Sequence, residues 1–489
     1  MNKALLFCIS TLLPALVSAA ASAQNILVEH VTLVSPHLDE LQKNQYVLIE
    51  NGRIEQISAT AISADKMAIR INGRGKYLTP GLMDSHAHVT IIPGIGFTTS
   101  KRAKNSPKLV DTYLKQQPRS FLYHGVTQVL DPSPLKGILK FTEAPVHPDL
   151  FKCGQIPNIG GYPEVEPEDA FTTSPFFILE GETPIPLPDT INPAEHTPEA
   201  VVERIAASGA ICVKIFIEDG FGDATQWPIL KDETVSRIRA AARAKGLPIL
   251  AHANAIDMYQ VALRNQVDVL AHGLWNWQWP EEKGPPPLEK TLTDVFETKT
   301  GYMPTIRVMA GLAGMFNPAL LEEAAIKKVT PSALLAWYHA PDAQWFKAEL
   351  REGFPADMPD SEINTIFNYG VSRDMRATKH LSDMGHPMLL ASDFPASPTY
   401  VNQPGLTTFQ EIQMLAEAGI SLKKILAAAT INNATQFGME ADYGTVEVGK
   451  IANLLLLRQN PLETVAAWDS IDTVFLHGKA INRETLQAQ

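Results

Sequence analysis

Cysteine is scarce in this chain. The sequence contains three cysteines among 489 residues, and one of them, Cys8, lies in the apolar N-terminal stretch. Only Cys153 and Cys212 remain, which excludes a small fold that depends on several disulfides. Because Cys212 lies in an apolar run typical of a buried strand, we predict that both cysteines are small apolar side chains of the core and do not form a bridge.

The sequence also lacks clusters of basic residues, heptad repeats and internal repeats. Its net charge is −12, so nothing in it would neutralise phosphates, and we expect no nucleic-acid partner. Beyond the N-terminal stretch, no apolar run is long enough to span a bilayer, and we expect no membrane partner once that stretch is removed. The composition does not decide the oligomeric state, which leaves a homo-oligomer open.

The first 23 residues have the pattern of a secretory signal peptide. Lys3 supplies the positive start, an apolar run follows, and Ala21–Ala23 form a small-residue cleavage site before Gln24. The apolar run is short and interrupted by proline, which makes it a poor membrane anchor. We therefore predict a secreted or periplasmic protein with a cleaved signal peptide at residues 1–23.

The length of the chain favours two domains. Residues 78–435 alternate between strand and helix patterns, which predicts an α/β fold, a TIM-like (β/α)₈ barrel. The eight predicted strands are Leu78–His88, Val126–Asp131, Leu150–Gly154, Ile211–Ile217, Pro248–Ala253, Val267–His272, Tyr302–Ile306 and Pro387–Asp393. Residues 24–77 and 436–489 contain short alternating strands with glycine turns such as Asn51-Gly52. We predict that they form one small β-sandwich built from both chain ends.

Residues that can bind metal stand on five of the predicted strands. The first strand ends in two histidines spaced so that they share a face, and the fourth strand has a lysine inside the apolar run "ICVKIFI". An unpaired lysine would be costly to bury there. Alone, each histidine has a structural explanation and the aspartate could cap a helix. The ends of barrel strands meet at the active site, so their coincidence predicts one metal site. The six residues are His86, His88, Lys214, His252, His272 and Asp393.

Several segments together resemble the amidohydrolase superfamily of metal-dependent hydrolases. They include "LTPGLMDSHAHV", "LPILAHAN", "VDVLAHG", "LLASDFP" and "AATINNATQFGMEADYGTVEVGKIANLLLL", and they run through nearly all of the chain after the signal peptide. The similarity is greatest to the branch that includes imidazolonepropionase-like proteins and the Xaa-Pro and Xaa-Arg/Lys dipeptidases. The first and last segments are the most specific of the set.

This resemblance implies a site with two divalent ions, zinc being the expected metal. His86, His88 and Asp393 would hold the more buried ion, and His252 and His272 the more exposed one. Lys214, carrying a carboxyl group derived from carbon dioxide, would bridge the two ions. Asp393 would also be the catalytic residue that accepts a proton from the attacking water. We further expect Asp84 to steady a histidine nitrogen.

The function implied is cleavage of a carbon–nitrogen amide bond in a small molecule, most simply a dipeptide or an N-acyl amino acid. A one-metal cyclic amide hydrolase or deaminase of the imidazolonepropionase kind is the alternative, against which Lys214 argues. A lactonase or organophosphate hydrolase also stays open, because the same nucleophile attacks esters. A binding or structural protein with an inherited barrel would have lost metal ligands, and none is lost here.

Candidate substrate contacts follow three of the predicted strands. Trp275 comes shortly after His272 in a tryptophan-rich loop, where it could line a pocket or pack under an insertion. Arg307 could bind a substrate carboxylate through its fork of donors, or form a surface salt bridge. Tyr302 presents a similar choice between contacting the substrate and a structural role. We interpret His124 and Asp131 as structural.

Overall fold

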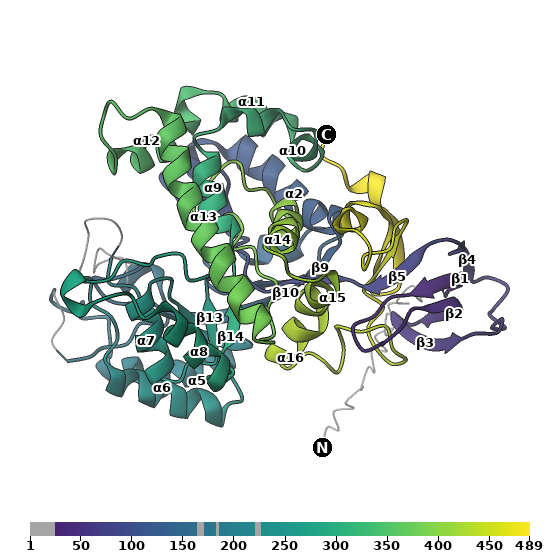
Figure 1. Cartoon of the computed structure of the whole chain (residues 1–489), viewed down its shortest axis with the longest axis horizontal. Helices are drawn as coiled ribbons and strands as arrows, with labels where there is room; N and C mark the ends of the chain where they lie inside the picture. Colours follow the sequence, from purple (N-terminus) through teal and green to yellow (C-terminus); the bar gives the residue numbers. More distant parts are fainter. Residues whose placement is uncertain (1–24, 164–170, 182–184, 221–225) are drawn as a thin grey trace, which may run out of the picture.

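The computed structural model describes residues 25–163, 171–181, 185–220 and 226–489 (Figure 1). The predicted signal peptide lies outside the described residues, so the structure does not bear on it. Within the described ranges, no helix combines the length and the apolar character needed to cross a membrane.

A curled sheet of seven parallel strands forms the centre of the molecule. Its strand order is β14-β13-β12-β11-β10-β9-β6. The bounds are β6 Leu82–Asp84, β9 Val126–Asp131, β10 Asp149–Ile156, β11 Cys212–Phe216, β12 Ile249–His252, β13 Val269–Ala271 and β14 Gly301–Met303. The predicted first strand, Leu78–His88, is divided: β5 (Tyr77–Pro80) belongs to another sheet, and only β6 joins this one.

An extended segment lies where the eighth strand was predicted. Met388 forms a parallel bridge to Tyr302 on β14, and Phe394 forms one to Ala87 just beyond β6. The Leu389 N–H donates to the carbonyl of Tyr302 at 2.9 Å. The segment therefore lies between the two edges of the curled sheet, which is consistent with a TIM-like barrel.

Side chains on the two faces of the sheet belong to different apolar clusters. Cys212, Leu250 and Met303 belong to an inner cluster to which every strand of the sheet contributes. Their neighbours, such as Val213 and Tyr302, pack with the helices in an outer cluster. This alternation follows from the two-residue period of a strand. The covering helices include α2 Pro107–Tyr123, α5 Pro198–Ala207, α6 Asp232–Ala244, α7 Ile256–Arg264, α8 Leu288–Thr298, α9 Arg307–Gly314, α13 Asp360–Asp383 and α14 Leu406–Glu417.

The two chain ends meet in a second sheet, whose early strands lie at one side of the molecule in Figure 1. Its order is β17-β16-β15-β5-β1-β2-β3, with β4 also paired to β1. The remaining bounds are β1 Ile26–Leu33, β2 Gln42–Glu50, β3 Arg53–Ser58, β4 Ile69–Asn72, β15 Leu454–Leu457, β16 Ile471–Leu476 and β17 Lys479–Asn482. The ends do combine, but the pairing is continuous through one eight-stranded sheet, so a sandwich of two sheets is not confirmed. The cause is β1, which pairs with β4 through Ile26–Glu29 and with β5 through Thr32 and Leu33.

The prediction for the two cysteines is wrong. Cys153 on β10 and Cys212 on β11 stand directly opposite each other in the parallel ladder, with their Cα atoms 4.4 Å apart, and they form a disulfide. Both side chains are buried in the inner cluster. The sequence placed each residue in an apolar strand correctly but did not reveal the strand register, which decides whether two thiols face each other.

Candidate metal centre

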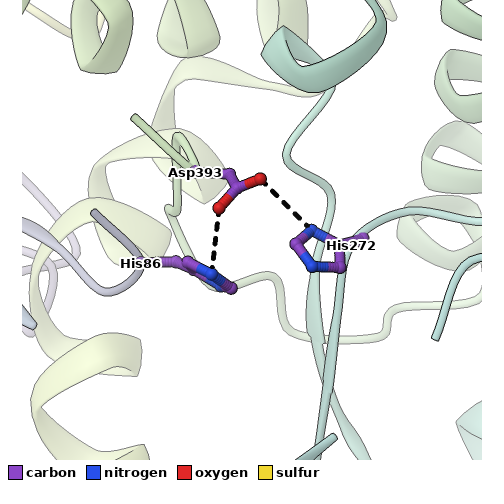
Figure 2. Close-up of side chains that lie close together, drawn as sticks. All are labelled: His86, His272 and Asp393. Atoms are coloured by element: carbon purple, nitrogen blue, oxygen red, sulfur yellow. Dashed lines mark ion pairs between the residues drawn. The ribbon is translucent and has the colours of Figure 1, made fainter. Parts of the chain in front are cut away.

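Asp393 is the residue around which the predicted ligands gather (Figure 2). Its Oδ1 lies 3.0 Å from Nε2 of His86 and 3.0 Å from Nε2 of His88. Its Oδ2 lies 3.8 Å from Nδ1 of His272. Ligand atoms of His86, His272 and Asp393 all lie within 4.8 Å of one another, a grouping that could hold a metal ion. The site is thus assembled from the ends of β6 and β13 and from the Met388–Phe394 segment.

The backbone is unusual at two of these residues. His272 follows β13 with φ of 82°, and Asp393 has φ of 52°. Positive φ is disfavoured for residues with a side chain, and such strain concentrates at functional sites. At His272 the strained backbone brings a side chain to the metal site directly after Ala271, which belongs to the inner cluster. The Oγ1 of Thr305, another residue with positive φ, lies 3.2 Å from Nδ1 of His272.

The fourth histidine joins the same group through ring contacts. The ring of His252 lies 4.5 Å from the ring of His272, which lies 5.0 Å from the ring of His86. The rings of His86 and His88 are 5.1 Å apart. All four imidazoles therefore form one continuous group with Asp393 at one side.

Lys214 is buried on the inner face of β11, two residues after Cys212. Among the described residues, its Nζ has no hydrogen-bond partner. Burial lowers the pKa of Lys214 to about 7, although the charge of Asp393 acts in the opposite direction. Burial also lowers the pKa values of His252 and His272, and the positive charge of Lys214 lowers them further. The amine is therefore close enough to the histidines for its charge to act on them.

The histidines differ in protonation because their partners differ. Burial lowers the pKa of His86 to about 3, which leaves a neutral imidazole suited to a metal. Burial acts in the same direction on His88, but hydrogen bonds to Asp131 and Asp393 outweigh it and raise the pKa of His88 to about 9. Nearby His86 and His272 hold the pKa of Asp393 well below its usual value, despite burial. A metal bound by His88 would therefore displace a proton.

Comparisons with known proteins bear on the family and on the fold of this chain. Residues 311–481 match the model of the amidohydrolase family. A solved Xaa-Pro dipeptidase with methionine in its active site is 18% identical, with a TM-score of 0.63 over 94% of this chain and 100% of that one. The ochratoxinase of A. niger is 17% identical, with a TM-score of 0.64 over 94% of this chain and 96% of that one. Residues 311–481 are thus similar to the amidohydrolase family, and the two solved structures share the fold of this chain.

One curated protein also matches part of this chain. It is the imidazolonepropionase of Symbiobacterium thermophilum, which is 35% identical over 80 residues, or 16% of this chain. The match spans only 18% of the length of that relative.

Two further carboxylates lie against the candidate metal ligands. Asp84 does not steady a histidine nitrogen as predicted; it accepts from the backbone N–H groups of His86 and Ser392 at 3.3 and 3.0 Å. Asp84 thereby joins the segments that carry His86 and Asp393. Asp131, interpreted as structural, lies 3.7 Å from Nδ1 of His88. Its place at the end of a barrel strand was the signal that could have identified it.

Two further residues near His252 were not singled out from the sequence. Tyr162 has its ring 4.6 Å from that of His252, and burial together with the charges of Asp393 and Glu218 raises its pKa. Glu218 lies two residues past β11 with a carboxylate oxygen 3.2 Å from Nε2 of His252. Both belong to loops that follow barrel strands, whose paths a strand pattern does not predict.

The structure does not support Tyr302 as a substrate contact. Its hydroxyl lies 3.3 Å from Asp374 and 3.1 Å from Thr378, both on α13. Tyr302 belongs to the outer cluster, whereas its neighbour Met303 belongs to the inner one. The prediction is wrong because successive side chains of a strand point to opposite faces. The side chain of Tyr302 points towards the helices, and that of Met303 points into the barrel.

Arg307 and Trp275 occupy less decisive positions. Arg307 is buried, and its guanidinium donates to Oδ1 of Asn402 at 2.7 Å, so the surface salt bridge is excluded. Asn402 in turn donates to the carbonyl of Pro395, next to the Asp393 segment. The indole N–H of Trp275 is buried without a hydrogen-bond partner among the described residues. A substrate role for either residue stays a prediction.

Gly273 offers a test of how tightly His272 is held. A Cβ at Gly273 would lie 1.8 Å from Oδ1 of the buried Asp374. Gly273→Ala should therefore cost about 1–3 kcal/mol of stability through overpacking and weaken zinc binding by displacing His272. The measurements are thermal unfolding and zinc titration. Gly353→Ala, where the nearest atom to the new Cβ lies at 3.7 Å, is the control, and equal effects of the two variants would contradict the prediction.

Proposed function

We propose that this protein is an exported metal-dependent amidohydrolase that cleaves a carbon–nitrogen amide bond. Its substrate would be a dipeptide or an N-acyl amino acid. The observation that carries the proposal is the buried Lys214 amine, which has no hydrogen-bond partner among the described residues and lies close to three histidines. The names of the relatives, an imidazolonepropionase and a Xaa-Pro dipeptidase, support hydrolysis of such bonds.

The residues present fit a centre with two divalent ions. Four imidazoles and one carboxylate are the donors that zinc prefers, and burial lowers the pKa of His86, His252 and His272 so that they are neutral. An isolated buried ammonium group would be costly. The pKa of Lys214, about 7, keeps a substantial neutral fraction, which is the form that attacks carbon dioxide. The new N–C bond forms as the amine loses a proton, and the resulting anion could bridge two cations.

When bound, the ions would lower the pKa of a water ligand and polarise the substrate carbonyl. The proposed task of Asp393 is to accept a proton from the attacking water and pass it to the leaving nitrogen. Asp393 is suited to this because its lowered pKa keeps it ionised at neutral pH. Arg307 remains a candidate for binding a substrate carboxylate, and Trp275 for contacting an apolar part of the substrate.

The test is reconstitution followed by a substrate screen. Metal-free protein is supplied with zinc and bicarbonate and then screened against dipeptides and N-acyl amino acids for release of a primary amine. We expect activity that depends on zinc, increases with bicarbonate and disappears with a chelator. Activity that survives complete removal of metal would contradict the proposal.

A one-metal cyclic amide hydrolase is the second candidate. Its support is the compact group of His86, His272 and Asp393, together with the imidazolonepropionase match. The two candidates predict different metal contents after reconstitution, about two ions per chain for the first and about one for the second. The one-metal candidate also predicts no dependence on bicarbonate.

Export rests on separate support. The predicted signal peptide at residues 1–23 precedes a domain with a disulfide between Cys153 and Cys212, and disulfides persist mainly in oxidising compartments. Expression of the full chain in a Gram-negative host, followed by cell fractionation, should recover the protein in the periplasm without its first 23 residues. Recovery of the uncleaved chain in the cytoplasm would contradict export.

A further inference from the structure

Glu218 is a buried acid at the edge of the candidate metal centre. It lies two residues beyond Phe216, the last residue of β11, and four residues beyond Lys214. Its side chain is 1% exposed, and Oε1 accepts from the backbone N–H of Gly220 at 3.3 Å. Among the described residues, the imidazole of His252 is the one basic group against it, and no lysine or arginine forms an ion pair with it. A buried carboxylate of this kind requires a positive partner.

The distance to His252 fits two ligands of one ion. Oε2 of Glu218 lies 3.2 Å from Nε2 of His252. Bonds of about 2.0–2.2 Å place neighbouring ligand atoms of a zinc ion about 3.0–3.5 Å apart. The pair of Nε2 of His86 and Oδ1 of Asp393, at 3.0 Å, has the same chemistry. Imidazole–carboxylate pairs at this spacing therefore occur both at His86 and at His252.

We infer that Glu218 is a ligand of the ion held by His252, an inference that rests on the proposed two-ion function. The ligand set implied by the family resemblance gives this ion His252, His272 and the carboxylated Lys214, and Glu218 would add a carboxylate next to His252. A further buried negative charge would also reduce the net positive charge of a centre with two dications. In this arrangement the metal ion is the positive partner of the buried Glu218 carboxylate.

The competing explanation is that Glu218 only orients His252 through a hydrogen bond. Loss of such an orienting group typically weakens metal binding by about 10–100-fold, so an alanine variant alone does not separate the two roles. Glu218→Gln does, because glutamine keeps an acceptor oxygen for the imidazole N–H but is a much poorer ligand than a carboxylate. Asp219→Asn is the matched control, since it removes a charge from the next residue along the chain.

The experiment measures the metal content of the purified, reconstituted full chain. After incubation with excess zinc and bicarbonate and removal of free metal, we expect about two ions per chain in the wild type and in Asp219→Asn. We expect about one ion in Glu218→Gln and in Glu218→Ala. Cobalt substitution gives a second readout, because losing a carboxylate ligand changes the visible absorption of the affected ion. Circular dichroism checks that the variants are folded.

The outcomes separate this inference from the proposed function. If the wild type binds two ions and Glu218→Gln also binds two, with affinity unchanged in a chelator competition, Glu218 is not a ligand and the proposed function stands. If the wild type binds no metal, the proposed function fails and this inference fails with it. Loss of one ion in both Glu218 variants, but not in Asp219→Asn, supports the inference.

Discussion

Asp393→Asn should lower kcat by about 10²–10⁴-fold, because the asparagine cannot accept a proton from the attacking water. Asp393 touches His86 and His88 through one oxygen and approaches His272 through the other. Asparagine preserves the shape and one oxygen ligand, so much of the loss should appear in kcat once zinc is saturating. The measurement is steady-state kinetics on the substrate identified in the screen, with metal content determined on the same sample.

The control for this variant is an aspartate distant from the centre. Asp442 is exposed and forms an ion pair with Arg53 at 2.7 Å, so Asp442→Asn should leave kcat unchanged. Near-full activity of a metal-loaded Asp393→Asn protein would remove Asp393 from the chemistry. A variant that loses its metal but regains activity at high zinc would limit Asp393 to the role of a ligand.

Lys214→Met should abolish most activity and, at the same time, stabilise the metal-free protein. Methionine is close to lysine in length and has no charge to bury, so the barrel interior should keep its packing. Without the amine there is no site for carboxylation, and we expect activity to fall by at least about 100-fold. The metal-free protein should gain stability at neutral pH, because an unpaired buried cation is removed.

The lowered pKa of Lys214 determines whether the stability of the metal-free protein rises or falls with pH. Burial lowers the pKa of Lys214 from 10.5 to about 7, so between these values the unfolded chain binds more protons than the folded one. Stability of the metal-free protein should therefore increase as the pH rises from about 7 to 10.5, and the full cost of the charged lysine is present below pH 7. Denaturation in urea with a chelator, at several pH values, measures this slope.

Lys214→Met should remove the part of the slope that Lys214 contributes. Lys43→Met, at an exposed position of β2, is the control and should leave the pH dependence as it is in the wild type. An unchanged slope in Lys214→Met would show that the amine is not buried as a free base in the metal-free protein.

The alternating pattern of strands and helices predicted the central sheet well. Seven predicted strands overlap observed ones, and the eighth overlaps the Met388–Phe394 segment that lies between the sheet edges. Such patterns are informative because burial on both faces makes each parallel strand a short apolar run. The Asn51-Gly52 turn was also predictable, and both residues have the positive φ that a tight hairpin turn requires.

The candidate centre was predictable to the extent that its residues stand at strand ends. His86, His88, His252, His272 and Asp393 form one group because the ends of parallel strands share one rim. Asp131 was interpreted as structural from the sequence, and Glu218 was not singled out. Asp131 belongs to the site because it lies near His88, and Glu218 because it lies near His252. In each pair the two residues are far apart in the sequence.

The sequence by itself determined which elements form and which residue types end them, since residue periodicity and local turn chemistry are encoded within a few neighbouring positions. The tertiary structure alone decided that Cys153 meets Cys212, that Tyr302 turns towards α13, and that Glu218 reaches His252. Each of these contacts depends on the register between strands and on the paths of loops. Those are set by packing across distant parts of the chain, where a shift of one residue reverses the face on which a side chain lies.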